Sequence, residues 1–141
     1  MEKYSIEKDI PVICVQAESF PLALGKAYQT LHELIQHDTR RKLYGISFGS
    51  KDGGIIYKAA AEEAFEGEAE KLHCEKFIIR KGTYASETLK DWRTNEGIVA
   101  TTFRKLLTHP QVDHNGYCVE IYPNGTDMIC LVKLSADDRS V

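Results

Sequence analysis

The chain has 141 residues, an ordinary length for one compact domain, and we expect a single domain over residues 1–141. Charged residues make up 28% of it, the formal net charge is −3, and lysines and arginines form no cluster, which argues against a direct nucleic-acid partner. No apolar run approaches the roughly 20 residues that span a bilayer, and the first residues, MEKYSIEKDI, lack the apolar stretch of a signal peptide, so we expect a cytoplasmic protein without a membrane segment.

The first predicted elements are a strand, a helix and a hairpin. Ile10–Gln16 (IPVICVQ) is rich in β-branched residues, which predicts a strand. Over Leu24–Ile35 apolar residues recur at spacings of three and four, which is typical of an amphipathic helix. Alternating apolar residues then run through Tyr44–Ala61 around the turn pair Gly53-Gly54, and this pattern predicts a β-hairpin.

An acidic stretch, Ala61–Lys71 (AEEAFEGEAEK), follows the hairpin. Its glycine and its charges predict a solvated connection between two half-domains. Beyond it the same order of elements returns. We predict a strand at Phe77–Arg80, a turn containing Gly82, a helix at Ile98–Leu107 and a second hairpin at Tyr117–Leu134.

The two hairpins read as one pattern written twice. Each opens with a tyrosine, Tyr44 or Tyr117, alternates apolar residues, and turns through a glycine-containing pair. We therefore predict an α+β fold of two duplicated βαββ units, with half-repeats of about residues 10–61 and 76–134. A pseudo-twofold axis is expected to relate the units, with a central cleft between them.

Strand alternation predicts which side chains face that cleft. In the second hairpin the more apolar face is expected to pack against a helix: Tyr117, Val119 and Ile121. The other face is expected to line the cleft: Cys118, Glu120 and Tyr122.

The first hairpin has two glycines and Ser47 at the matching positions, which predicts a hole. Pairing across the two turns is expected to place Tyr57 beside Ser47 and Cys130 beside Glu120. The predicted pocket is mostly apolar, with aromatic and sulfur-containing side chains around one carboxylate. Its lining is Ser47, Tyr57, Cys118, Glu120, Tyr122, Met128 and Cys130.

Several of these residues have two interpretations. Trp92, the only tryptophan, lies in an irregular segment, where it either closes the cleft as a lid or packs beneath a long loop. Tyr84, in a turn, is either a ligand contact or core packing, and the same alternatives hold for Tyr57 and Tyr122. Glu120 fits either a ligand-binding carboxylate or the solvated face of a sheet.

Other chemistry has little support in the sequence. The four cysteines show no CxxC spacing, which favours buried thiols over a disulfide. None of the five histidines has a partner at helical or hairpin ligand spacing, apart from His109 and His114 around a proline loop, so we expect no metal site. No cofactor is expected, because no glycine-rich phosphate loop precedes either helix, and no GxSxG motif supports a serine hydrolase.

Four segments together resemble the GyrI-like small-molecule-binding domain, which is also the effector-binding module of AraC-type and MerR-type transcription regulators. They are YASETLKDW, FRKLLTHP, NGYCVEIYPNG and MICLVKL, and the resemblance covers nearly the whole chain. Its strongest piece is Val119-Glu120-Ile121-Tyr122, because the family's characteristic acidic residue occupies the position of Glu120. The resemblance implies a cleft that takes amphipathic, often aromatic and cationic compounds beside that carboxylate. It also implies that the aromatic residue at the position of Tyr84 lies near the ligand.

The regulators of this family carry a DNA-binding domain ahead of the module. Here the first predicted strand begins at Ile10, so we expect a stand-alone small-molecule-binding protein that is linked to transcription regulation or toxin resistance through its ligand. The resemblance leaves two alternatives open. One is a hydrolase of strained electrophilic rings that uses Glu120 as general acid or base, and the other is a protein that binds a regulator or inhibits a DNA topoisomerase.

Overall fold

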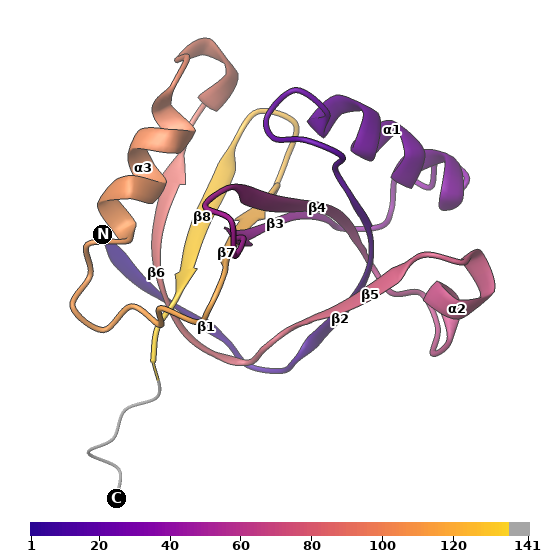
Figure 1. Ribbon diagram of the computed structural model, residues 1–141, viewed down its shortest axis with the longest axis horizontal. Coiled ribbons are helices and arrows are strands. Elements are labelled where there is room, and N and C mark those ends of the chain that lie inside the picture. Colours follow the sequence, from indigo (N-terminus) through magenta and orange to yellow (C-terminus); the bar gives the residue numbers. More distant parts are fainter. Residues whose placement is uncertain (136–141) are drawn as a thin grey trace, which may run out of the picture. The chain divides into compact units, whose positions relative to one another are not determined.

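The computed structural model describes residues 1–135 (Figure 1). The chain divides into two compact units. The first unit is Asp9–Ile79. The second unit is Met1–Lys8 together with the chain from Arg80 onward. The chain therefore passes from the second unit into the first after Lys8 and returns after Ile79.

Four antiparallel strands and two helices make the first unit. The strands, in their order across the sheet, are β3 (Leu43–Gly49), β4 (Ile55–Glu62), β2 (Ile10–Gln16) and β5 (Glu75–Ile79). The helices are α1 (Leu24–Leu34) and α2 (Glu68–Leu72). The predicted strand at Ile10–Gln16, the helix and the first hairpin are confirmed.

Helix α1 covers the face of the sheet that the odd-numbered residues of β2 and β4 form. Its Ala27 and Leu31, with Ile35 just beyond its end, pack against this set: Ile13, Tyr57, Ala59 and Ala61. The alanines leave room for the helix backbone to approach the sheet, and Ala59 and Ala61 are fully buried as a result. This cluster is the hydrophobic core of the first unit on its helix side.

Four antiparallel strands and one α-helix make the second unit. The strands, in their order across the sheet, are β1 (Glu2–Ile6), β6 (Gly82–Leu89), β8 (Met128–Lys133) and β7 (Cys118–Ile121). Helix α3 (Ile98–Leu106) lies against β6 and β8 (Figure 1), and a short 3₁₀ helix, Trp92–Thr94, precedes it. The predicted helix and the second hairpin are confirmed.

Several element ends of the two units lie at the same offset along the chain as Tyr44 and Tyr117. Strand β5 keeps this offset from β1 at both ends, since Glu75 corresponds to Glu2 and Ile79 to Ile6. Strand β6 ends at the same offset from the end of β2, with Leu89 corresponding to Gln16. In each unit a βαββ segment has the strand order first, third, second, and an extra strand, β5 or β1, pairs antiparallel with the first.

The structure corrects the start of the second half. Gly82–Leu89, predicted as a turn and an irregular segment, is strand β6, so Tyr84 lies in a strand and not in a turn. The predicted strand at Phe77–Arg80 is β5, which pairs with β2 inside the first unit. Strand β6, GTYASETL, is rich in small and polar residues, and both of its faces are buried at Tyr84 and Ala85. It therefore lacks the alternation of apolar and polar residues that predicts a strand.

The acidic stretch Ala61–Lys71 is not a solvated connection between halves. Strand β4 continues to Glu62, and helix α2 follows. Glu68 is buried because the Arg41 guanidinium binds its carboxylate through two hydrogen bonds of 2.8 and 2.9 Å and also donates to the carbonyl of Glu62. A paired carboxylate, which the composition could not reveal, therefore brings this stretch onto the first unit.

No helix within residues 1–135 combines the length and the apolar character needed to cross a membrane.

Candidate functional site

Glu120 lies on the face of the second unit's sheet that α3 covers. Strand pairing sets Glu120 opposite Cys130 of β8, and Cys130 opposite Glu87 of β6. Cys130 is fully buried and belongs to the core cluster that contains Leu106 of α3. The result is a row of two half-buried carboxylates with a buried thiol between them.

The expected helix-packing face of the second hairpin is therefore wrong. The helix packs on the face of Cys118 and Tyr122, and the face of Val119 is the opposite one. The neighbouring strand decides this, because β8 presents Met128, Cys130 and Val132 to α3. Both faces are apolar and Val119 is itself fully buried, so the composition of β7 alone could not tell them apart.

Tyr122 binds the Glu120 side chain through a hydrogen bond. Its hydroxyl donates to Oε1 of Glu120 at 2.6 Å, a short bond of the kind that a carboxylate makes with a phenol. The Tyr122 ring lies 6.3 Å from the Trp92 ring, centroid to centroid, at an angle of 50°. Carboxylate, phenol and indole thus follow one another along one side of the α3 core cluster.

Trp92 is half-buried against the same cluster. The Arg93 guanidinium lies 4.5 Å from its ring centroid, a cation–π distance. The indole Nε1 is buried and has no hydrogen-bond partner among residues 1–135. Because the indole ring contacts Tyr122 within the fold, Trp92 combines the packing of a core residue with a place next to the carboxylate.

The two carboxylates of the row have different partners. Glu87 Oε1 accepts a hydrogen bond of 2.8 Å from the ammonium of Lys105, which belongs to α3. Glu120 accepts its short bond from the neutral hydroxyl of Tyr122. Glu87 is therefore paired with a cation of its own unit, and it provides a control for Glu120 on the same face of the sheet.

Burial and charge both act on the thiol in the row. Burial raises the pKa of Cys130 to about 12, and the carboxylates of Glu120 and Glu87 contribute to the rise. A thiol with this pKa stays protonated at neutral pH and is a poor nucleophile or metal ligand. In the part of the chain that the structure describes, no group of three or more His, Cys, Asp or Glu side chains could hold a metal ion.

The predicted site residues of the first unit lie on the helix-side face of its sheet, where Tyr57 belongs to the core cluster and Ser47 is half-buried. Ser47 pairs with Tyr57, as the hairpin pattern predicted. Tyr57 is 2% exposed, its hydroxyl lies 2.8 Å from that of Tyr28, and the Phe20 ring stacks on it at 5.9 Å. Gly49 is exposed, and an added Cβ there would meet no atom within 4 Å.

Tyr84 lies on the opposite face of the second unit's sheet from Glu120. It is fully buried, and its hydroxyl donates to the carbonyl of Arg80 at 2.6 Å and lies 2.8 Å from the hydroxyl of Tyr117. Its contacts within the unit are those of a core tyrosine with a satisfied hydroxyl. The structure thus brings together five of the predicted residues around Glu120, and Tyr84 is not among them. The five are Trp92, Cys118, Tyr122, Met128 and Cys130.

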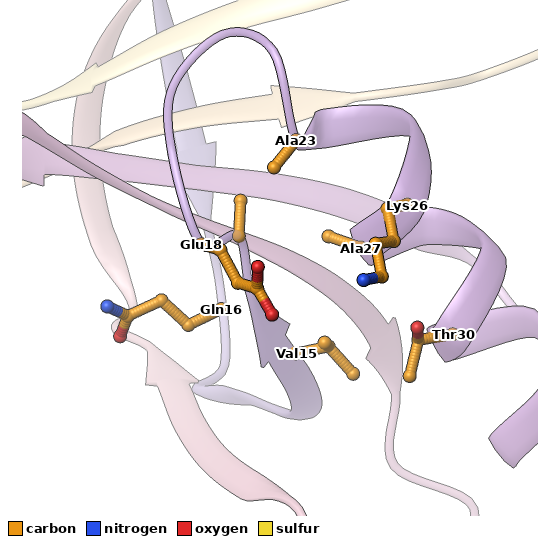
Figure 2. A pocket seen from close by; sticks show the side chains of 8 residues that line it. Val15, Gln16, Glu18, Ala23, Lys26, Ala27 and Thr30 are labelled. Atoms are coloured by element: carbon orange, nitrogen blue, oxygen red, sulfur yellow. The ribbon is translucent and has the colours of Figure 1, made fainter.

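A small surface pocket lies elsewhere, in the first unit (Figure 2). It has a volume of about 180 Å³ and is bounded by the end of β2 and by α1, with Glu18 and Lys26 among its lining residues. Pockets for drug-sized ligands are usually about 300–1,000 Å³. None of the predicted site residues lines it, and its size fits only a very small ligand. The cleft expected between the two halves stays a prediction.

Sequence reasoning missed Glu87, Lys105 and Asp127. Glu87 and Lys105 could have been found only from the β6–β8 register, because nothing near them in the sequence marks a row with Glu120. Asp127 follows Asn124-Gly125 in the predicted turn, and an Asn and an Asp in one turn are a signal for side chains that bind backbone N–H groups.

Comparison with known proteins shows the fold. No protein-family model and no curated protein matches the chain. Among solved structures, SAV2435 bound to tetraphenylphosphonium matches with a TM-score of 0.70 at 10% identity, over 96% of this chain and 93% of that one. A protein described as a bacterial transcription regulation protein from Staphylococcus aureus MU50 matches with a TM-score of 0.61 at 8% identity, over 96% and 97%. A hydrolase from Listeria innocua matches with a TM-score of 0.58 at 11% identity, over 95% and 91%.

At these identities the likeness concerns the fold alone. The chain has an α+β fold with antiparallel strands, shared by proteins of different described roles, one of which was solved with a lipophilic phosphonium cation. This fold is consistent with the one that the resemblance to the GyrI-like domain implies.

Proposed function

We propose that the chain binds amphipathic small molecules that carry a positive charge and aromatic groups, with Glu120 facing the cation. The observation that carries the proposal is the side-chain series in the second unit. The half-buried carboxylate of Glu120 is bound by Tyr122, whose ring contacts Trp92. Aromatic faces and a carboxylate are the groups that attract organic cations.

The structural likeness supports the same ligand class. SAV2435 was solved with tetraphenylphosphonium, which has one positive charge surrounded by phenyl groups. The aromatic side chains Trp92 and Tyr122 offer the surface, and Glu120 the charge, that such an ion needs. A role in transcription regulation or toxin resistance would follow from binding such a ligand, and one match described as a transcription regulation protein is in keeping with it.

The test compares two ions of nearly the same shape and opposite charge, tetraphenylphosphonium and tetraphenylborate. Binding is measured by calorimetry and by the emission of Trp92, the only tryptophan of the chain. We expect the cation to bind and the anion to bind at least about tenfold more weakly, because a half-buried carboxylate attracts a cation and repels an anion.

The variant Glu120→Gln keeps the shape of the side chain and removes its charge. We expect this variant to lower the affinity for tetraphenylphosphonium by about tenfold. Glu87→Gln, in the same row but paired with Lys105, is expected to change that affinity by less than roughly twofold. Binding of both ions with equal affinity, or an unchanged affinity in Glu120→Gln, would contradict the proposal.

A second candidate function is hydrolysis of a strained ring such as an epoxide. The 2.6 Å hydrogen bond between Tyr122 and Glu120 favours it, because the pair holds a proton acceptor next to a proton donor. In this reaction water attacks a ring carbon while Glu120 takes a proton from that water. The ring C–O bond breaks, and the Tyr122 hydroxyl donates its proton to the departing oxygen.

The hydrolase proposal is tested with a panel of aryl epoxides and detection of the diol, one water heavier, by mass spectrometry. Turnover is expected to be lost in both Glu120→Gln and Tyr122→Phe while cation binding survives in Tyr122→Phe. A panel without any diol formation above the uncatalysed rate removes this candidate.

We also propose that the two units arose by duplication. The support is the shared offset in the chain between β1 and β5 and between the ends of β2 and β6, together with the same strand order in each unit. Binding to a regulator or to a topoisomerase stays a prediction, because no observation on the described residues favours it.

A further inference from the structure

Asp127 is a buried carboxylate in the turn between β7 and β8, and it is bound by several donors. It is 8% exposed. Within the turn it accepts hydrogen bonds from Nδ2 of Asn124 at 3.0 Å and from Oγ1 of Thr126 at 3.1 Å. The carbonyl oxygen of the Asn124 side chain closes the turn by accepting the N–H groups of Thr126 and Asp127 at 2.8 and 2.9 Å.

Two further donors to Asp127 come from the segment that follows β6. They are the Nζ of Lys90 at 3.1 Å and the backbone N–H of Asp91 at 3.2 Å. Asp91 directly precedes Trp92 and has a φ of 48°, in the left-handed region that non-glycine residues rarely adopt. Asp127 therefore binds the backbone at the residue whose left-handed conformation sets the position of Trp92.

The same turn also binds Trp92 and its neighbour directly. The backbone N–H of Trp92 donates to the carbonyl of Thr126 at 3.3 Å, and Nη1 of Arg93 donates to the carbonyl of Gly125 at 3.0 Å. Residues 90–93 thus bind residues 125–127 through hydrogen bonds from every position of the segment. The turn connects β7, which carries Glu120, to β8. The same hairpin therefore positions both the indole and the carboxylate.

Within the described residues, the first unit has no such link between its turn and its loop. Asp52 in the β3–β4 turn is bound by the Ser50 hydroxyl of the same turn. In the corresponding loop, residues 17–23 of the described chain, the backbone donates to the hairpin only through the N–H of Ala17, to the carbonyl of Tyr57. In that loop Phe20 is 43% and Leu22 is 92% exposed. The link in the second unit is therefore not a general requirement of this fold.

We propose that Asp127 is a positioning residue of the ligand site: it fixes Trp92 next to Tyr122, and so makes the site select cations with aryl groups over small cations. This inference rests on the proposed function for its ligand, but the placement of Trp92 can be tested without one. An indole held in place loses little conformational freedom on binding an aryl group, whereas a loosened indole has to be ordered first.

The first test uses the protein without ligand. In Asp127→Ala we expect the emission of Trp92 to shift to longer wavelength and its quenching by acrylamide to increase, because the segment 90–93 loses its central acceptor. Asp127→Asn keeps one acceptor oxygen and is expected to fall between the wild type and Asp127→Ala. Asp52→Ala, which changes the turn carboxylate of the first unit, is expected to leave the emission unchanged.

The second test compares tetraphenylphosphonium with tetramethylammonium. Asp127→Ala is expected to lower the affinity for tetraphenylphosphonium by about tenfold and that for tetramethylammonium by less than roughly twofold. The reason is that only the aryl cation needs the fixed indole. Glu120→Gln is expected to weaken both. If Asp127→Ala fails to fold, Lys90→Ala and Arg93→Ala remove links from the segment side and are expected to act in the same direction.

The outcomes separate this inference from the proposed function. If the wild type binds neither cation, the proposed function fails, while altered Trp92 emission in Asp127→Ala still supports the positioning role. Unchanged emission and quenching in all the Asp127 variants overturn the positioning role. Equal loss of the two cations in Asp127→Ala overturns the selectivity.

Discussion

The helix-side faces of the two units differ in the side chains that they place on one shared arrangement of strands. In the first unit Ser47 and Tyr57 face each other, and Tyr57 is bound by Tyr28, whose hydroxyl also donates to the carbonyl of Tyr44 at 3.0 Å. These groups are hydroxyls and aromatic rings. On this face, between β3 and β4, the first unit thus satisfies its polar atoms with hydroxyls.

The second unit has Glu120 where the first has Ser47, and Cys130 where the first has Tyr57, at the offset that also relates Tyr117 to Tyr44. A carboxylate stands in place of a hydroxyl, and Tyr122 and Trp92 lie beside it where the first unit has the tyrosine pair Tyr28 and Tyr57. The two units thus place different groups on one arrangement of strands, hydroxyls in the first and a carboxylate beside two aromatic rings in the second. This difference is what assigns the proposed ligand site to the second unit.

The largest expected effects are losses of stability from the hydrophobic cores, where the two units should respond alike. Leu31→Ala in the first unit and Leu106→Ala in the second each remove a fully buried side chain, so each is expected to lower the free energy of unfolding by about 2–5 kcal/mol. Urea unfolding followed by circular dichroism measures both. The matched controls are Leu22→Ala and Leu107→Ala, at positions that are 92% and 48% exposed, with expected changes within about 0.5 kcal/mol.

A core variant that costs no more than its exposed control would show that the corresponding helix does not pack as described.

The same substitution in each unit should separate packing from ligand binding. Tyr57→Phe removes the hydroxyl of a buried side chain that lies within hydrogen-bond distance of the Tyr28 hydroxyl, and it is expected to lower the free energy of unfolding by about 1 kcal/mol without changing the affinity for tetraphenylphosphonium. Tyr122→Phe removes a half-buried hydroxyl, so its effect on stability is expected to be smaller, and because it removes a hydrogen bond to Glu120 but keeps the carboxylate, the affinity for tetraphenylphosphonium is expected to change without being lost. Denaturation and calorimetry on both variants make the comparison, and a reversed pattern would place the ligand in the first unit.

Much of the fold could be predicted from local pattern. Strong periodicity and clear turns mark these elements: the strand Ile10–Gln16, the helices α1 and α3, and both hairpins. The position of the second turn also predicted that Glu120 lies opposite Cys130. Strand β6 was missed because it is rich in small and polar residues and is covered on both faces, so it has no alternation to detect. The short strand β1 was missed because its partner β6 lies in a distant part of the chain, beyond the whole of the first unit.

The site could be predicted only in part. Its carboxylate and its aromatic residues are visible in the sequence, but the side on which α3 packs depends on β8 and not on β7. The Glu87–Lys105 pair and the binding of Asp127 to Lys90 join residues that only the folded strands bring together. Long-range pairing of polar side chains has no local signal, and this is why those residues were not predicted.

Acid titration should reveal the link between the turn and Trp92, which distinguishes the second unit from the first. The Asn124 amide, the Asp91 N–H and the Lys90 ammonium hold the pKa of Asp127 far below its usual range. A lowered folded-state pKa means that the stabilisation is fully present above the unfolded value of about 3.9 and is lost as the pH falls toward the folded-state pKa. We expect the Trp92 emission to be constant from pH 7 to about 4 and to shift only below that range.

In Asp127→Asn the acid shift of the emission should be absent or much smaller, since no carboxylate remains at this position. A transition near pH 6 would instead point to a histidine and would contradict the role of Asp127.

The smallest expected effect is on thiol chemistry, where the two units should behave alike despite their different charges. Burial raises the pKa of Cys14 to about 12; Lys58 lowers it, whereas for Cys130 both nearby carboxylates raise it. Because burial is the main cause in each case, neither thiol should react with iodoacetamide at pH 8 in the native protein, and both should react in urea. Peptide mass spectrometry of the labelled protein measures this, with the half-buried Cys118 as the internal reference. Glu120→Gln removes one of the charges next to Cys130 but not its burial, so it should leave Cys130 unreactive. Rapid labelling of Cys130 in that variant would mean that the carboxylate, and not α3, keeps reagents from the centre of the row.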